Sequence, residues 1–205
     1  MALSQSSPLR EQHAELTREL ILGALVDLLQ ADERGEISVP EVARKAGVSL
    51  RTVYRYFPTR DELFAAGTDW IFARTLGDVQ AEETIDDLVE NTRALAERWE
   101  AHPKLARALV LSPTGGQLRR HRREQRRREI GRVVDATAGR LTEAERKQVT
   151  AVLGLVHSLR FWVALRDDLG LSREDAAAAV DWALRALIDD VRRRNRAAGR
   201  KGGRT

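Results

Sequence analysis

Residues 42–60 combine side chains that can bind the phosphate groups and the base edges of DNA. The segment has no carboxylate, and its cations are Arg44, Lys45, Arg51, Arg55 and Arg60. A guanidinium group can pair with guanine through two hydrogen bonds, and hydroxyl groups and cations can hold phosphate. Runs of charged residues on helices are usually solvated surface. The composition alone therefore does not establish DNA binding, and a structural motif is needed to support that interpretation.

Two short helices joined by a tight turn are expected to present these side chains. Residues 38–41, Ser-Val-Pro-Glu, have the pattern of a capping box that begins a helix. Gly47 can adopt the left-handed conformation that ends this helix, Ser49 can cap the next one, and Pro58 stops it. The apolar residues that would lock the two helices together are Val42, Ala43, Ala46, Val48, Val53 and Phe57. A helix-turn-helix over residues 38–57 is therefore predicted.

Residues 38–64, SVPEVARKAGVSLRTVYRYFPTRDELF, resemble the DNA-binding signature of the tetracycline-repressor (TetR) family. The resemblance covers about residues 10–72 and implies a DNA-binding domain there. It implies that phosphates are held by Ser38, Tyr54, Tyr56 and Arg60, and that bases are read by Leu50, Arg51 and Thr52. Ser49 and Arg55 complete the predicted DNA-binding set. Arg51 stands where the family often has a small residue, so the operator sequence of another member cannot be assumed for this chain. Arg60 replaces the more usual Lys and keeps its positive charge.

Residues 73–195 are predicted to form a second helical domain for effector binding and dimerisation, which makes the fold all-α. The chain has few aromatic residues and is rich in helix formers. Residues 149–165 are apolar on more than one face, and the last helix has an apolar stripe. Together these two segments have more apolar surface than a monomer usually leaves exposed. We therefore expect a homodimer held by a four-helix bundle. The predicted interface residues are Val180, Trp182, Leu184, Leu187, Ile188 and Val191.

Turn and capping patterns predict where the other helices begin and end. A helix from Thr59 to about Val79 should link the two domains, and residues 112–116, Ser-Pro-Thr-Gly-Gly, read as a loop. Thr142 and Ser172 should cap the last two long helices. The arginine-rich residues 117–132 are interpreted as a solvated helix, with a second DNA contact as the alternative.

The resemblance also implies a ligand cavity in the second domain, for a small and largely apolar effector. The candidate residues are Trp70, Phe72, Trp99, His102, His157, Phe161 and Trp162. Ordinary core packing is the alternative for each aromatic residue, and single histidines on apolar helices are more often hydrogen-bonded interior groups.

Other classes of protein find little support in the sequence. There is no cysteine, the four histidines have no metal-ligand spacing, and no phosphate loop or nucleophile motif occurs, so no metal, cofactor or catalysis is expected. The N-terminus lacks the apolar core of a signal peptide, and no apolar run approaches the roughly 18 residues of a membrane span. A cytoplasmic protein without membrane contact is expected.

The predicted partner is double-stranded operator DNA, bound by a regulator that the resemblance favours as a repressor. The alternative is an architectural protein that tolerates any DNA sequence, which the basic residues 196–205, expected to be a disordered tail, would suit. A ratio of specific to nonspecific affinity near one would favour this alternative.

Overall fold

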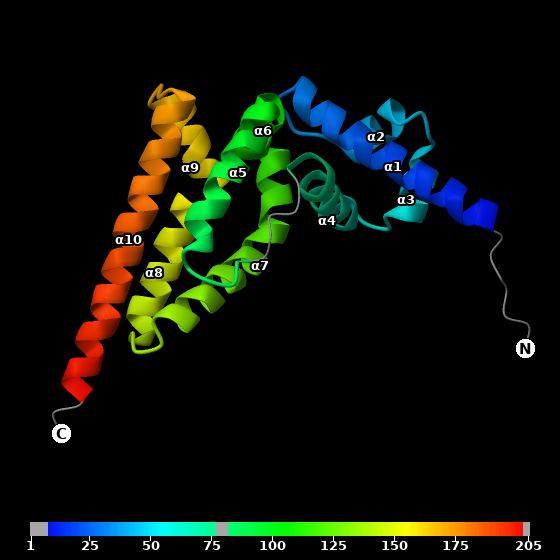
Figure 1. Ribbon diagram of the computed structural model, residues 1–205. Helices are drawn as coiled ribbons and strands as arrows, with labels where there is room; N and C mark the ends of the chain where they lie inside the picture. Colours follow the sequence, from blue (N-terminus) through cyan, green and yellow to red (C-terminus); the bar gives the residue numbers. More distant parts are fainter. Residues whose placement is uncertain (1–7, 77–81, 203–205) are drawn as a thin grey trace, which may run out of the picture.

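The computed structural model describes residues 8–76 and 82–202, and every regular element in these two ranges is a helix. A head and a larger body lie side by side (Figure 1). The head consists of α1 (Pro8–Ala31), α2 (Val39–Lys45), α3 (Leu50–Tyr56) and α4 (Arg60–Ile71), which continues as the π-helical turn η1 (Phe72–Leu76). The body consists of α5 (Asp87–Ala101), α6 (Pro103–Leu111), α7 (Pro113–Thr137), α8 (Glu143–Val156), α9 (Leu159–Val163), the π-helical turn η2 (Ala164–Asp168) and α10 (Arg173–Gly202). The predicted all-α fold is confirmed.

The head folds as its local sequence predicts. Ser38 and Glu41 form the reciprocal capping box at the start of α2, and Gly47 has a φ of 69°, the left-handed conformation that the turn requires. Val42, Val53 and Phe57 are at most 2% exposed and pack with buried residues of α1. The two helices of the motif are thus held rigidly to each other and to α1.

Two buried hydrogen bonds join the head to the body. The backbone N–H of Ile37 donates to Thr114 Oγ1 (2.8 Å), and Thr68 Oγ1 on α4 donates to the carbonyl of Leu118 on α7 (3.0 Å). Thr114 is fully buried and Thr68 is 2% exposed. Since an unpaired buried polar group costs about 1–3 kcal/mol, these bonds favour one orientation of the head.

The predicted loop at residues 112–116 is wrong, because only Ser112 precedes the first turn of α7. The Ser112 hydroxyl accepts a hydrogen bond from the N–H of Gly115 (2.8 Å), and Pro113 occupies a first-turn position, where its missing N–H costs nothing. Gly115 is required by packing, since a Cβ there would lie 2.2 Å from the carbonyl oxygen of Ala108 on α6.

The predicted apolar helix over residues 149–165 is broken into α8 and α9. His157 ends α8 and Ser158 caps α9, with its hydroxyl accepting from the N–H of Phe161 (3.3 Å). Among the described residues no single helix is both long and apolar enough to span a membrane. Glu143–Val156 and Leu159–Asp168 reach that length and hydropathy only together, across a bend of 51°.

The apolar stripe of α10 is covered inside the protomer, which corrects the predicted interface. Val180, Leu184, Ile188 and Val191 are at most 2% exposed because α10 packs against α5 and α8. Leu187 is half-buried, and Trp182 is 73% exposed.

The predicted disordered tail is also corrected over residues 196–202, which continue α10 as helix. Asn195 anchors this part of α10 to the turn between α7 and α8. Its Oδ1 accepts from the N–H of Arg140 (3.0 Å), and its Nδ2 donates to the carbonyl of Thr137 (3.3 Å). Residues 203–205 and Val79, the predicted end of the linking helix, lie outside the described residues.

Candidate DNA-binding interface and ligand pocket

The exposed face of α3 carries the predicted base-reading side chains. Ser49 caps the helix by accepting a hydrogen bond from the N–H of Thr52 (3.0 Å), and buried Val53 fixes the opposite face to the core. Leu50 is 41% exposed, and Arg51 and Arg55 are exposed as well. A capped helix with one anchored face and one basic face has the geometry for insertion into a major groove.

The predicted phosphate-binding residues differ in their exposure and in the partners that they already have. Tyr54 is 43% exposed, whereas Tyr56 is half-buried with the Arg55 guanidinium 5.0 Å from its ring centroid. The Ser38 hydroxyl donates to Glu41 Oε2 (2.6 Å) as part of the capping box. This hydrogen bond is the main reason that the pKa of Glu41 lies below its usual value.

Arg60 has partners within the head. Its Nη2 donates to Glu36 Oε1 (3.0 Å) and to the carbonyl of Ile37 (3.3 Å), and its guanidinium lies 4.8 Å from the ring centroid of Phe64. The structure thus brings Arg60 next to the start of α2, beside Ser38. A phosphate at this position would have to share the guanidinium with Glu36.

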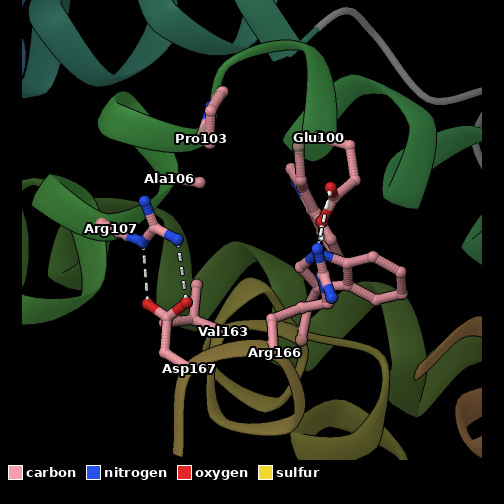
Figure 2. A pocket seen from close by; sticks show the side chains of 9 residues that line it. Glu100, Pro103, Ala106, Arg107, Val163, Arg166 and Asp167 are labelled. Carbon is pink, nitrogen blue, oxygen red and sulfur yellow. Dashed lines mark hydrogen bonds and ion pairs between the residues drawn. The ribbon is translucent and has the colours of Figure 1, made fainter. Parts of the chain in front are cut away.

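The candidate effector residues do not form one pocket but lie in separate parts of the structure. The ring centroids of Trp99 and Trp162 are 6.1 Å apart, and both residues line an open cleft of about 200 Å³ between α5, α6 and the α9–η2 segment (Figure 2). Trp70 and Phe72 instead lie near the end of α4, where the guanidinium groups of Arg74 and Arg122 stack on their rings. His102 and Phe161 are half-buried and do not line the cleft.

Two ion pairs give the cleft a charged rim (Figure 2). Arg107 Nε lies 2.9 Å from Asp167 Oδ2, and Arg166 Nε lies 2.9 Å from Glu100 Oε1, which also accepts from Trp162 Nε1 (3.1 Å). Sequence reasoning missed these pairs because their members are 60 and 66 residues apart. The cleft is smaller than the roughly 300–1,000 Å³ of common ligand sites, so a ligand of ordinary size would need it to widen.

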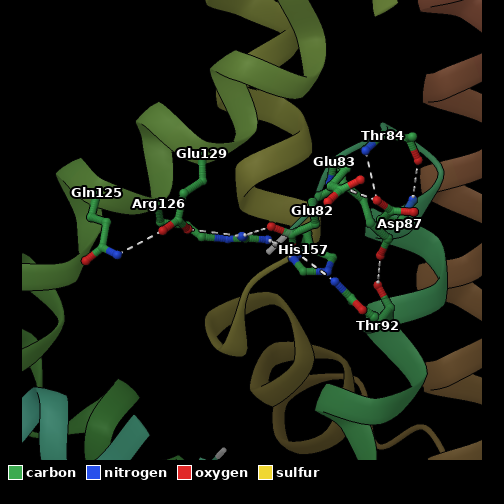
Figure 3. A network of polar contacts seen from close by, with 11 residues as sticks. Glu82, Glu83, Thr84, Asp87, Thr92, Gln125, Arg126, Glu129 and His157 are labelled. Carbon is green, nitrogen blue, oxygen red and sulfur yellow. Dashed lines mark hydrogen bonds and ion pairs between the residues drawn. The ribbon is translucent and has the colours of Figure 1, made fainter. Parts of the chain in front are cut away.

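His157 is buried and belongs to a partly buried polar network of its own (Figure 3). Arg126 on α7 binds Glu82 through two hydrogen bonds (2.7 and 2.9 Å) and donates to His157 Nδ1 at 2.5 Å. Burial, followed by the charge of Arg126, lowers the pKa of His157 to about 4, so the ring is neutral at pH 7. The network ties α7 to the segment before α5 and to the break between α8 and α9.

The fold and the geometry of the head define a helix-turn-helix DNA-binding protein with a helical body. Residues 21–66 match the family described as bacterial regulatory proteins, tetR family. The head of this chain therefore matches the tetR-family DNA-binding domain over residues 21–66, as the resemblance predicted.

The proteins that resemble the chain include a nucleoid occlusion factor and a repressor. It is 35% identical over 72 residues to the nucleoid occlusion factor SlmA of Marinobacter nauticus, a match that covers 33% of this chain and 37% of that protein. The fold is similar to that of NalD, described as the secondary repressor of the MexAB-OprM multidrug efflux pump in Pseudomonas aeruginosa. The TM-score is 0.57 at 17% identity, over 85% of this chain and 96% of NalD, which shows a shared fold.

Proposed function

We propose that the protein is a dimeric transcriptional regulator that binds operator DNA through α3 and represses transcription until a small molecule binds the body. The observation that carries the DNA-binding part is the exposed basic face of α3 on a head that matches the tetR family over residues 21–66. An architectural DNA-binding protein would not need base-reading side chains on a rigid helix.

The contacts between head and body support control by a ligand. α1 packs on α6 and α4 packs on α7, and the two buried hydrogen bonds of Thr114 and Thr68 cross the same junction. A ligand that shifts α6 or α7 would therefore move the head. Such a ligand must bind the arrangement that cannot bind DNA more tightly, by about 5.5 kcal/mol for a shift from 1:99 to 99:1.

The cleft between Trp99 and Trp162 is the place that we propose for the apolar part of the effector. The two indole rings supply an aromatic wall, and the charged rim can orient a polar group. Because the cleft holds only about 200 Å³, effector binding would have to separate α6 from the α9–η2 segment. Movement of α6 would reach the head through α1.

Sequencing of the genomic fragments that the purified protein retains tests the proposal. A regulator should enrich a small set of fragments that share an inverted repeat, because the two heads of a dimer read two half-sites. Equal retention of all fragments at physiological salt would instead support the architectural alternative. Compounds that quench tryptophan fluorescence and also release the enriched fragments would then support the effector role of the cleft.

A further inference from the structure

The arginines of α7 divide into those with an acidic partner and those without one. Arg126 pairs with Glu82, and Arg127 and Arg128 both pair with Glu124. Arg119 and Arg123 form no ion pair with any residue of the described ranges, and the same holds for Arg160 on α9. The charge of this helix is therefore locally unbalanced around Arg119.

Arg119 is the least solvated member of this group. Its Nη1 is buried and has no hydrogen-bond partner among the residues that the structure describes. Burial is the main reason that the pKa of Arg119 is lowered to about 10, and the nearby charges of Arg160 and Arg123 lower it further. At neutral pH the group remains a cation beside two other cations.

Such an arrangement is unfavourable unless something balances it. A buried guanidinium nitrogen without a partner loses its hydration without compensation, and like charges nearby add repulsion. Buried polar groups in proteins almost always have partners, so the unpartnered Nη1 of Arg119 needs an explanation, and a bound anion would supply one. A planar guanidinium suits the paired oxygens of a phosphate or a carboxylate.

We propose that the half-buried Arg119, with the exposed Arg123 and Arg160, binds the phosphate or carboxylate group of a small anionic ligand. The position also links the ligand to the head, because the adjacent carbonyl of Leu118 accepts the hydrogen bond from Thr68 on α4. The regulatory part of this inference rests on the proposed function, whereas the anion site itself does not.

Thermal unfolding of the full chain in different salts tests the site without DNA. The phosphate probes are inorganic phosphate and pyrophosphate, and the carboxylate probes are acetate and hexanoate. Each is compared with chloride at equal ionic strength. At concentrations about tenfold above the Kd, the favoured anion should raise the Tm of the wild-type protein by about 3 °C or more. Stabilisation by the phosphates alone or by the carboxylates alone identifies the group that is bound.

Two variants of α7 separate this site from general charge effects. Arg119→Met should abolish most of the anion-dependent rise in Tm, and in chloride it should unfold at a higher temperature than wild type because an unpaired buried charge is gone. Arg120→Met removes the same charge from an exposed neighbouring position and should keep the full response to the anion. Arg160→Gln should weaken anion binding about tenfold, because one charged hydrogen bond to the anion is lost.

Three results would overturn the proposal. The first is a wild-type Tm that no probe raises above its value in chloride. The second is equal loss of the response in Arg119→Met and Arg120→Met, which would mean that the anions act on net charge. The third is a lower Tm of Arg119→Met in chloride, which would mean that Arg119 stabilises the protein without a bound anion. Anion binding that leaves DNA retention unchanged would refute the regulatory link and leave the proposed DNA-binding function intact.

Discussion

Arg51 projects from the exposed face of α3, near its N-terminal end, where a recognition helix meets base edges. Arg60 differs from it, because it is bound to Glu36 and to the carbonyl of Ile37 at the edge of the head. The two arginines are therefore expected to serve DNA binding in different ways.

Replacement of each arginine by alanine tests this difference. Arg51→Ala should cost about 1–3 kcal/mol on an enriched fragment and little on a scrambled one, because a base contact is lost. Arg60→Ala should weaken binding to both DNAs similarly. The measurement is the Kd for both DNAs at one fixed salt concentration. An unchanged ratio of the two Kd values in Arg51→Ala would exclude Arg51 as a base-reading residue.

The neutral state of His157 predicts a dependence of stability on pH. Its pKa is about 4 in the folded protein and about 6.5 when unfolded, so the unfolded chain binds a proton more readily. The stabilisation is complete above pH 6.5 and is lost as the pH falls towards 4. Between pH 7 and pH 5 this group alone should lower the free energy of unfolding by about 2 kcal/mol.

Urea unfolding of wild type, His157→Phe and His13→Phe at both pH values measures this contribution. His157→Phe should show the smaller pH dependence, although the loss of its bond to Arg126 should lower its stability at pH 7. His13→Phe should keep the wild-type dependence, because His13 is exposed on α1. The same slope in all three proteins would contradict a buried, neutral His157.

At the scale of elements, the contact between α6 and α7 depends on one of two adjacent glycines. A Cβ at Gly115 would lie 2.2 Å from the carbonyl oxygen of Ala108 and 2.5 Å from the Cα of Leu109, whereas a Cβ at Gly116 would meet nothing within 4 Å. Both glycines lie in the first turns of a helix, so alanine has the same intrinsic advantage at both positions.

Alanine substitutions at these positions should therefore have opposite effects. Gly115→Ala should destabilise the protein by about 1–3 kcal/mol or more, because backbone must move to admit the methyl group. Gly116→Ala should stabilise it by about 0.5–1 kcal/mol, because alanine loses less conformational freedom in a helix. Denaturant unfolding measures both values, and destabilisation by both substitutions would argue against close packing of α6 on α7 as the cause.

At the scale of the whole molecule, α8 and α10 lie on the side of the body away from the head (Figure 1). Large apolar side chains remain exposed on them, with Trp182 73%, Leu155 52% and Val152 44% exposed. Exposed apolar groups of this size on adjacent helices are typical of a subunit interface. We expect the dimer to form through these side chains rather than through the buried stripe of α10.

The double variant Trp182→Glu, Leu155→Glu should convert the dimer to a soluble monomer, because two carboxylates cannot be buried without partners. Since both side chains are already exposed in the protomer, its own core should remain folded. Leu111→Glu is the matched control, as Leu111 is 45% exposed on α6. Light scattering gives the mass of each variant, and a native dimer from the double variant would place the interface elsewhere.

The helix-turn-helix of the head could be predicted from the sequence, because its caps and its turn depend on interactions between residues close in the chain. The Ser38 capping box, the left-handed Gly47 and the Ser49 cap each involve partners within four positions, and all three are present. Side-chain chemistry and local spacing were sufficient to place α3 and its exposed face. The match of residues 21–66 to the tetR family has the same local origin.

Which surfaces of the body are covered could not be predicted from the sequence, because the covering helices are distant in the chain. The Ser-Pro-Thr-Gly-Gly segment reads as a loop until α6 is seen to pack against Gly115. The apolar stripe of Leu184 and Ile188 was predicted as a dimer interface, but α5 and α8 cover it within the protomer. The local sequence around Arg119 does not indicate that its guanidinium is buried without a partner. Burial and ion pairing in the body depend on helices that are tens of residues apart in the chain. Amphipathic spacing predicts that a helix has an apolar face, but it does not indicate which helix packs against that face.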